Sequence, residues 1–152
     1  MNVINKPGID MNAKKGVVAG FSAGIAMMIS GIVVWGTTQG YLMPAYEASA
    51  ALWKPMEPLS TWLAQMWALT IVEGILYGLV YSVLYSGIPG KNISKGLNFA
   101  VILWLVGTVP GMAITYLSMA VPNLIIASWV FGGLINLLVM GAVLAFVYER
   151  VK

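Results

Sequence analysis

Four long apolar segments, separated by short polar stretches, make up most of the chain. They cover about residues 14–37, 62–86, 94–119 and 124–148. Each is longer than the roughly 20 apolar residues that a helix needs to cross the hydrocarbon core of a bilayer. The pattern therefore predicts an all-α integral membrane protein, a four-helix transmembrane bundle over residues 14–148. Residues 1–13 are polar and read as a flexible cytoplasmic tail, and residues 149–152 as a short cytoplasmic C-terminus.

The first connector is the longest polar stretch between segments. Pro44 and Pro55 bracket residues 45–54, which predict a short helix separate from the first span. That helix would lie on the membrane surface or form a loop that caps the bundle. Ser60 or Thr61 is the expected N-cap of the second span.

The third segment contains a proline near its centre. Pro110 lacks a backbone donor and clashes with the preceding turn, so a kink near mid-membrane is expected there.

The basic residues fall on alternating sides of the predicted spans. Seven occur in the N-terminal tail, the second connector and the C-terminus, and only Lys54 occurs in the first connector. The seven are Lys6, Lys14, Lys15, Lys91, Lys95, Arg150 and Lys152. Positive charge is enriched on the cytoplasmic side, so both termini are expected to be cytoplasmic and the protein to reside in the cell membrane.

Composition narrows the function classes. Of the 152 residues, 60% are hydrophobic and 9% charged, and there is no Cys or His. Thiol and imidazole chemistry are thereby absent, so no metal site or cofactor is expected. The four acidic residues other than Glu73 lie outside the spans, which leaves no catalytic pair inside the membrane and predicts a protein that is not an enzyme. The net charge of +3 sits at segment ends and does not indicate nucleic-acid binding.

Glu73 is the one ionisable residue inside a predicted span, near the centre of the second. A carboxylate at that depth costs about 2.5–3.5 kcal/mol on insertion scales, so it is a functional hypothesis by default. Counting residues from the segment ends places Asn136, Thr108 and Ser30 at a similar depth. We expect Glu73 to hydrogen-bond Asn136 in a buried midplane cluster, with Thr108, Tyr77 or a serine of the first span as further candidates.

Glycines recur at spacings that suit close helix packing. In the first span they occupy every fourth position, and the second span carries a Gly-xxx-Gly pair. The glycines expected at helix contacts are Gly16, Gly20, Gly24, Gly74, Gly78, Gly132 and Gly141.

The two halves of the chain look alike. Lys15-Gly16 opens the first span as Lys95-Gly96 opens the third, and residues 73–85 align with 136–148 so that Gly78 matches Gly141 and Tyr85 matches Tyr148. Such similarity indicates two parallel two-helix repeats, although three identities in thirteen positions also arise by chance in apolar helices.

Residues 70–148 resemble small four-span prokaryotic membrane proteins of unknown function. The resemblance rests on Gly87-Ile88-Pro89-Gly90-Lys91, followed by Lys95-Gly96-Leu97 and an aromatic-rich span. It implies a four-span fold and assigns no functional residue.

Two functional hypotheses remain open. The first is a non-enzymatic helix-packing or assembly subunit of the bilayer, which associates with itself or with partner subunits and in which Glu73 is a buried polar clasp. The alternative is a proton-linked transporter or channel for a small solute, acting as a homo-oligomer, with Glu73, Tyr77, Asn136 and the Pro110 kink as working parts.

Overall fold

A computed structural model describes residues 12–152, and the predicted tail lies almost wholly outside this range. Within it the chain is helical, with no strand. The elements are α1 (Ala13–Ala48), a 3₁₀ turn (Ala50–Leu52), α2 (Leu59–Leu84), α3 (Ile93–Leu103), a π-helical turn (Trp104–Thr108), α4 (Val109–Ser118) and α5 (Asn123–Tyr148). Because α3, the π turn and α4 are continuous, the described residues form four helices that are long and apolar enough to cross a membrane. The predicted all-α, four-span fold is confirmed.

α1 is much longer than the predicted first span. The prediction of a separate helix over residues 45–54 is wrong, because α1 continues through Pro44 to Ala48. Pro44 removes the hydrogen bond to the carbonyl of Gly40, and the helix continues past it. Ala45 and Tyr46 pack against the buried residues Val121, Ile125 and Ile126 around the start of α5, which holds the last turn of α1 in place.

The third span is irregular near its centre, just before Pro110. Trp104–Thr108 carries the wider hydrogen-bond pattern of a π-helical turn, with the Val109 amide bonded to the Trp104 carbonyl. Pro110 follows as the second residue of α4, and because it has no N–H it cannot donate the next helical hydrogen bond. The kink at Pro110 stays a prediction, since the irregularity that the structure shows is the π turn.

α2 begins earlier than expected. Its first residue is Leu59, with Pro58 at the N-cap, and neither Ser60 nor Thr61 caps the helix as predicted. At its other end the turn to α3 is built on Gly90, whose φ of +101° only glycine adopts readily.

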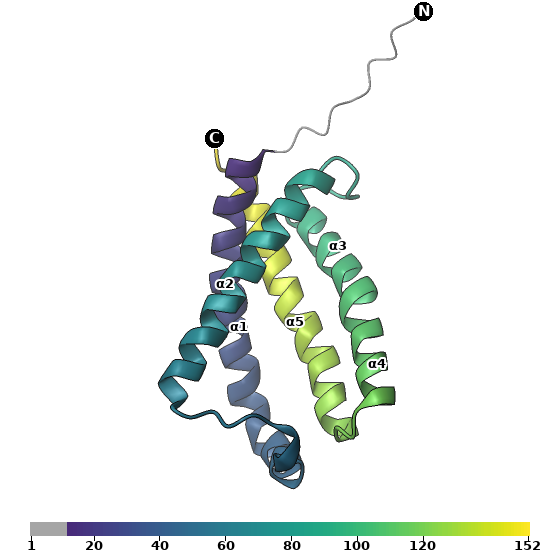
Figure 1. Cartoon of the computed structure of the whole chain (residues 1–152). Coiled ribbons are helices and arrows are strands. Elements are labelled where there is room, and N and C mark those ends of the chain that lie inside the picture. The colour runs from purple at the N-terminus through teal and green to yellow at the C-terminus, as the bar shows by residue number, and fades with distance from the viewer. Residues whose placement is uncertain (1–11) are drawn as a thin grey trace, which may run out of the picture.

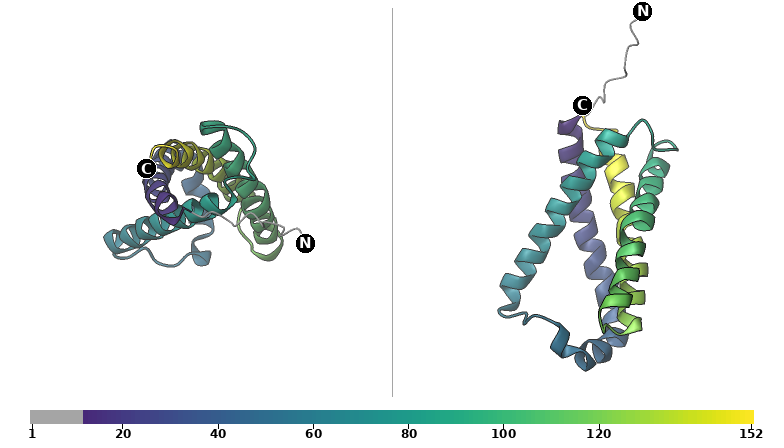
Figure 2. Two further views of the ribbon diagram at one scale, coloured as in Figure 1. Left: turned by 90° about the horizontal axis from the view of Figure 1, so that it is seen from above. Right: turned by 45° about the vertical axis from the view of Figure 1, so that its right-hand side comes forward.

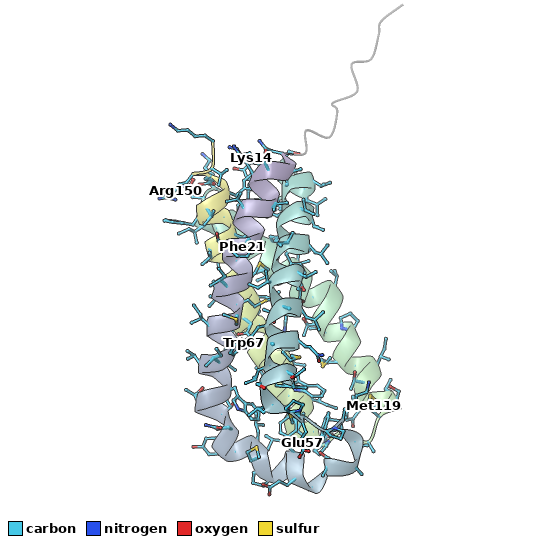
Figure 3. All side chains as sticks on the ribbon, turned by 60° about the vertical axis from the view of Figure 1, so that its left-hand side comes forward. Lys14, Phe21, Glu57, Trp67, Met119 and Arg150 are labelled. Atoms are coloured by element: carbon cyan, nitrogen blue, oxygen red, sulfur yellow. The ribbon has the colours of Figure 1, made fainter. Side chains whose placement is uncertain are left out.

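Toward the connector end the helices form a row rather than a closed ring. α1 packs against both α2 and α5, and α5 packs against α3 and α4. Figure 1 shows α2 crossing α1 near the chain termini and running away from it toward the opposite end, and the views of Figure 2 agree. Lys14 and Arg150 mark the terminal end in Figure 3, and Glu57 and Met119 mark the connector end. Within residues 12–152, one flank of α2 is therefore left without a neighbouring helix.

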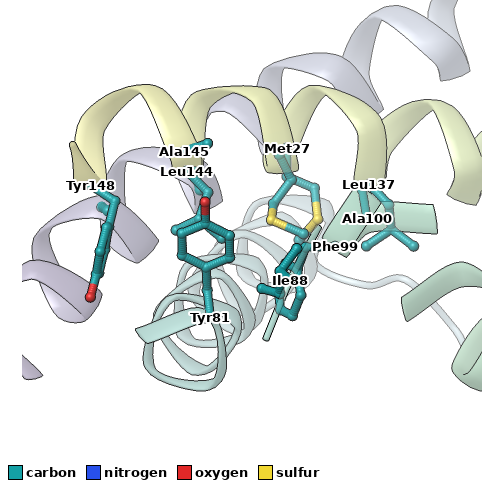
Figure 4. Close-up of a cluster of buried hydrophobic side chains, with 12 residues drawn as sticks. Met27, Tyr81, Ile88, Phe99, Ala100, Leu137, Leu144, Ala145 and Tyr148 are labelled. Atoms are coloured by element: carbon teal, nitrogen blue, oxygen red, sulfur yellow. The ribbon is translucent and has the colours of Figure 1, made fainter. Parts of the chain in front are cut away.

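The main core lies in the terminal half of the bundle (Figure 4). Tyr81 of α2, Phe99 of α3, and Met140 and Leu144 of α5 are fully buried. The Tyr81 ring meets those of Phe99 and Tyr148 edge to face, with centroids 5.2 and 5.3 Å apart. This core joins α2 to α3 and α5 near the terminal end.

A second cluster lies at the connector end. Tyr46 contacts the rings of Trp35 and Trp53, and its hydroxyl accepts a hydrogen bond of 2.9 Å from the Trp129 indole. This cluster ties the end of α1 to α5, whereas α2 has no part in it.

Candidate functional site at the middle of the bundle

Three of the predicted site residues lie near the middle of their helices. Ser30, Glu73 and Asn136 each fall within two residues of the midpoint of α1, α2 and α5. The structure does not gather them into one cluster. It forms two separate pairs.

The first pair joins α1 to α5. The Ser30 hydroxyl donates a hydrogen bond of 2.7 Å to the amide oxygen of Asn136, and both side chains are half-buried. A polar group inside a membrane must find its partners in protein, and this bond gives the Ser30 hydroxyl and the Asn136 amide oxygen one each. This pair is the polar clasp of the bundle.

The second pair lies within α2. The Tyr77 hydroxyl donates a hydrogen bond of 2.6 Å to Oε1 of Glu73. The expected hydrogen bond between Glu73 and Asn136 does not form, and Glu73 is exposed on the flank of α2 rather than buried. Within residues 12–152, Oε2 of Glu73 has no hydrogen-bond partner.

Two features of the packing keep Glu73 away from Asn136. The first is depth: Gly74 packs between Gly20 and Gly24, which puts Glu73 roughly 12 Å along α1 from the level of Ser30. The second is the rotation of α2 about its axis. Gly74 and Gly78 fix the face of α2 that packs on α1, and this rotation turns Glu73 outward. The Tyr77 side chain lies between the face of α2 that packs on α1 and the exposed flank that carries Glu73, and it packs at the edge of the core.

Thr108 lies in neither pair. Its side chain is half-buried, and its methyl group faces Gly133 of α5, 3.4 Å from where a Cβ of that glycine would be. The polar contact from this part of the chain comes from Trp104, whose indole N–H donates to the Val130 carbonyl at 2.9 Å. Sequence analysis missed this bond, because nothing in the pattern marks Val130 as an acceptor.

The glycines expected at helix contacts lie at such contacts, and all of these contacts are inside the chain. A Cβ on Gly20 would come within 2.5 Å of the Gly74 carbonyl oxygen and 2.8 Å of the Ile75 Cα. Gly16 faces Gly78, and Gly24 faces Ile71. Gly132 packs on Val34 of α1. The contacts of Gly16, Gly20 and Gly24 bring the α1 and α2 backbones together in the way that small-xxx-small ridges permit.

The second half of the chain repeats this contact. Gly96 of α3 and Gly141 of α5 approach so closely that a Cβ on either would overlap the other's carbonyl oxygen. In the alignment of the two halves, Gly96 matches Gly16 and Gly141 matches Gly78. The structure therefore uses corresponding glycines for the closest contact in each half, as parallel repeats require.

Aligned residues also meet at the terminal end. The rings of Tyr85 and Tyr148 stack, with centroids 5.0 Å apart. The Lys95 ammonium lies 3.9 Å from the centre of the Tyr85 ring and donates to the Tyr85 carbonyl.

An apolar groove of about 400 Å³ lies along α1 and α5 beside the polar clasp. It is lined by Ala26, Ile29, Ser30, Val33, Val34, Ile135 and Val139. Since the Ser30 hydroxyl is already bonded to Asn136, the groove presents mainly hydrocarbon.

No protein-family model, curated protein or solved structure matches the chain. Its chemistry must therefore be argued from the arrangement of its own residues.

Proposed function

We propose that this protein is a non-enzymatic assembly subunit of the membrane, whose helical row is completed by another transmembrane helix on the free flank of α2. The observation that carries the proposal is the position of Glu73. Its carboxyl lies near the middle of a membrane-length helix, on the exposed side of the chain.

A lipid-facing carboxyl at this depth is costly. Insertion scales give about 2.5–3.5 kcal/mol for an acidic residue at the centre of a span. The bond from Tyr77 satisfies one carboxyl oxygen and leaves the other in hydrocarbon. A neighbouring helix that brings a hydrogen-bonding group to Glu73 removes part of that cost, and such bonds contribute about 1–2 kcal/mol in model peptides.

The rest of the chain supports a packing role. Its other mid-span polar pair, Ser30 and Asn136, joins α1 to α5, and the glycines of the α1–α2 and α3–α5 contacts face one another inside the chain. Glu73 is the ionisable side chain near the middle of a span whose carboxyl is only partly satisfied among residues 12–152.

We further propose that the termini face the cytoplasm and that the protein resides in the cell membrane. The described basic residues support this orientation. Lys14, Lys15, Lys91, Lys95 and Arg150 all belong to the terminal end of the bundle, and positive charge is retained on the cytoplasmic side.

The proton-linked hypothesis drew on Glu73, Tyr77, Asn136 and the Pro110 kink. Tyr77 donates to Glu73, but in the described part of the chain no hydrogen bond joins either of them to Asn136. The assembly role is therefore the function that the geometry supports best.

The test is the mass of the protein extracted gently from its membrane. Light scattering or native mass spectrometry should give a protein mass above the 16.3 kDa of one chain, in both mild detergent and lipid nanodiscs. A single chain in both settings would contradict the assembly role.

A further inference from the structure

The free flank of α2 carries a regular repeat. Six of the exposed residues of α2 recur at alternating spacings of three and four, which is the 3.5-residue period of helices that supercoil around each other; Trp67, Val72 and Leu84 are also exposed beside them. The residues, called the α2 seam below, are Met66, Leu69, Glu73, Leu76, Val80 and Val83. Leu69 is 64% exposed and Leu76 is 55% exposed, so these large apolar side chains contact nothing substantial in their own chain.

The seam lies opposite the face that α2 uses internally. In the seven-residue repeat, Ile71 and Gly78 occupy the position farthest from the seam, and both pack on α1. A helix docked on the seam would therefore leave the contact between α1 and α2 undisturbed. From Met66 to Val83 the seam rises about 26 Å, most of the thickness of a hydrocarbon core.

Polar complementarity points to a second copy of this chain as the occupant. Copies of a membrane protein share one orientation, so two α2 helices meeting seam to seam run parallel. In a two-fold arrangement each residue on the seam lies level with its own counterpart. The Glu73 side chains of the two copies then lie opposite each other at the same depth, because the symmetry alone places them there.

The two carboxyls can satisfy each other. Oε1 of Glu73 already accepts from Tyr77, and Oε2 is free. A protonated carboxyl can donate through Oε2 while its counterpart accepts, so one shared proton or two removes the charge repulsion between them. A single polar residue in an otherwise apolar seam also fixes the register of the pair.

We propose that the α2 seam is the interface of a parallel homodimer, with the two Glu73 carboxyls hydrogen-bonded across the two-fold axis. The inference rests on the proposed assembly function and names its partner. A helix of another protein with a basic or amide side chain at the same depth is the competing occupant.

Disulfide cross-linking in native membranes tests the interface directly, because the chain has no cysteine of its own. Leu69→Cys and Leu76→Cys place thiols on the seam. Ala68→Cys is the matched control, since Ala68 is exposed at nearly the same depth but faces away from the seam. Val106→Cys, at a position 68% exposed on the π turn, controls for random collision.

Under mild oxidation the two seam variants should form covalent dimers at least about tenfold faster than the two controls, since a disulfide needs Cα atoms within about 7 Å. Glu73→Ala should weaken the dimer about 5- to 30-fold, and Glu73→Gln, which can still donate and accept, should retain it. Equal rates at seam and control positions would overturn the homodimer.

The two proposals fail in different ways. A large complex with no seam cross-link would overturn the homodimer and leave the assembly role standing. A protein mass of one chain in both detergent and nanodiscs would contradict the assembly role and the homodimer alike.

Discussion

Ser30 and Asn136 join α1 and α5 through a hydrogen bond of 2.7 Å at the middle of the bundle. The bond links residues 106 positions apart in the sequence and gives the Asn136 amide oxygen its partner on α1. Glu73 takes no part in it, and within residues 12–152 its carboxyl bonds only Tyr77. The Ser30–Asn136 bond contributes to the stability of one chain, whereas Glu73 is the residue through which we propose that chains associate.

The Ser30–Asn136 bond should appear as a coupling between the two positions. In a double-mutant cycle of Ser30→Ala and Asn136→Ala, we expect about 0.6–2 kcal/mol of interaction free energy of unfolding. Unfolding of the micelle-bound protein by added sodium dodecyl sulfate, followed by circular dichroism, provides the measurement. Additive effects of the two substitutions would contradict the bond.

The contact between α1 and α2 should not tolerate a methyl group. Gly20→Ala is expected to lower the free energy of unfolding by about 1–3 kcal/mol, because the new Cβ would overlap backbone atoms of Gly74 and Ile75 that cannot move independently. Gly36→Ala is the matched control, since a Cβ there meets nothing within 4 Å. Alanine at that position should be neutral or stabilise the helix by up to about 1 kcal/mol. Equal effects at the two glycines would contradict the packing.

If the two halves are repeats, the contact between α3 and α5 should be as sensitive to a glycine-to-alanine substitution as the contact between α1 and α2. Gly141→Ala should cost about 1–3 kcal/mol, as we also expect of Gly78→Ala, because each Cβ would strike the backbone of the facing helix. Gly111→Ala serves as the control in this half, with open space around its Cα. The same unfolding titration compares all three variants, and tolerance of Gly141→Ala would argue against equivalent contacts.

Tyr81 offers a test of the buried core. Its hydroxyl is buried without a hydrogen-bond partner, whereas that of Tyr148 lies 3.1 Å from the Ser82 hydroxyl. Tyr81→Phe should therefore leave stability unchanged or raise it by about 1 kcal/mol, and Tyr148→Phe should lower it by about 0.5–1.5 kcal/mol. A loss above 1 kcal/mol for Tyr81→Phe would show that its hydroxyl is satisfied, for example by a trapped water molecule.

The sequence was informative where a local pattern determines structure. Apolar run length located the four spans, and the spacing of Gly16, Gly20 and Gly24 identified the face of α1 that α2 approaches. The pattern predicts that α1 ends before Pro44, because proline usually breaks a helix, whereas α1 continues to Ala48. The packing of Tyr46 on distant Trp53 and Trp129 stabilises that turn, and no local pattern reports it.

The candidate site was predicted only in part. Residue counting placed Ser30, Glu73 and Asn136 at one level, but the contact of Gly74 with Gly20 and Gly24 puts Glu73 roughly 12 Å along α1 from the Ser30–Asn136 pair. The rotation of each helix about its axis follows from which glycines meet, and that depends on a pairing between segments far apart in the sequence. This is why Asn136 pairs with Ser30 while Glu73 faces outward.

Counting chains per particle in liposomes tests the central claim most directly. A fluorophore on Lys152→Cys, reconstituted over a range of lipid dilutions, reports one or two bleaching steps for each particle. We predict that the chain with native Glu73 gives mainly two steps, and that Glu73→Ala shifts to one step at about 5- to 30-fold less dilution while Glu73→Gln does not. Single steps at every dilution, or a Glu73→Ala curve that coincides with that of native Glu73, would contradict pairing through this carboxyl.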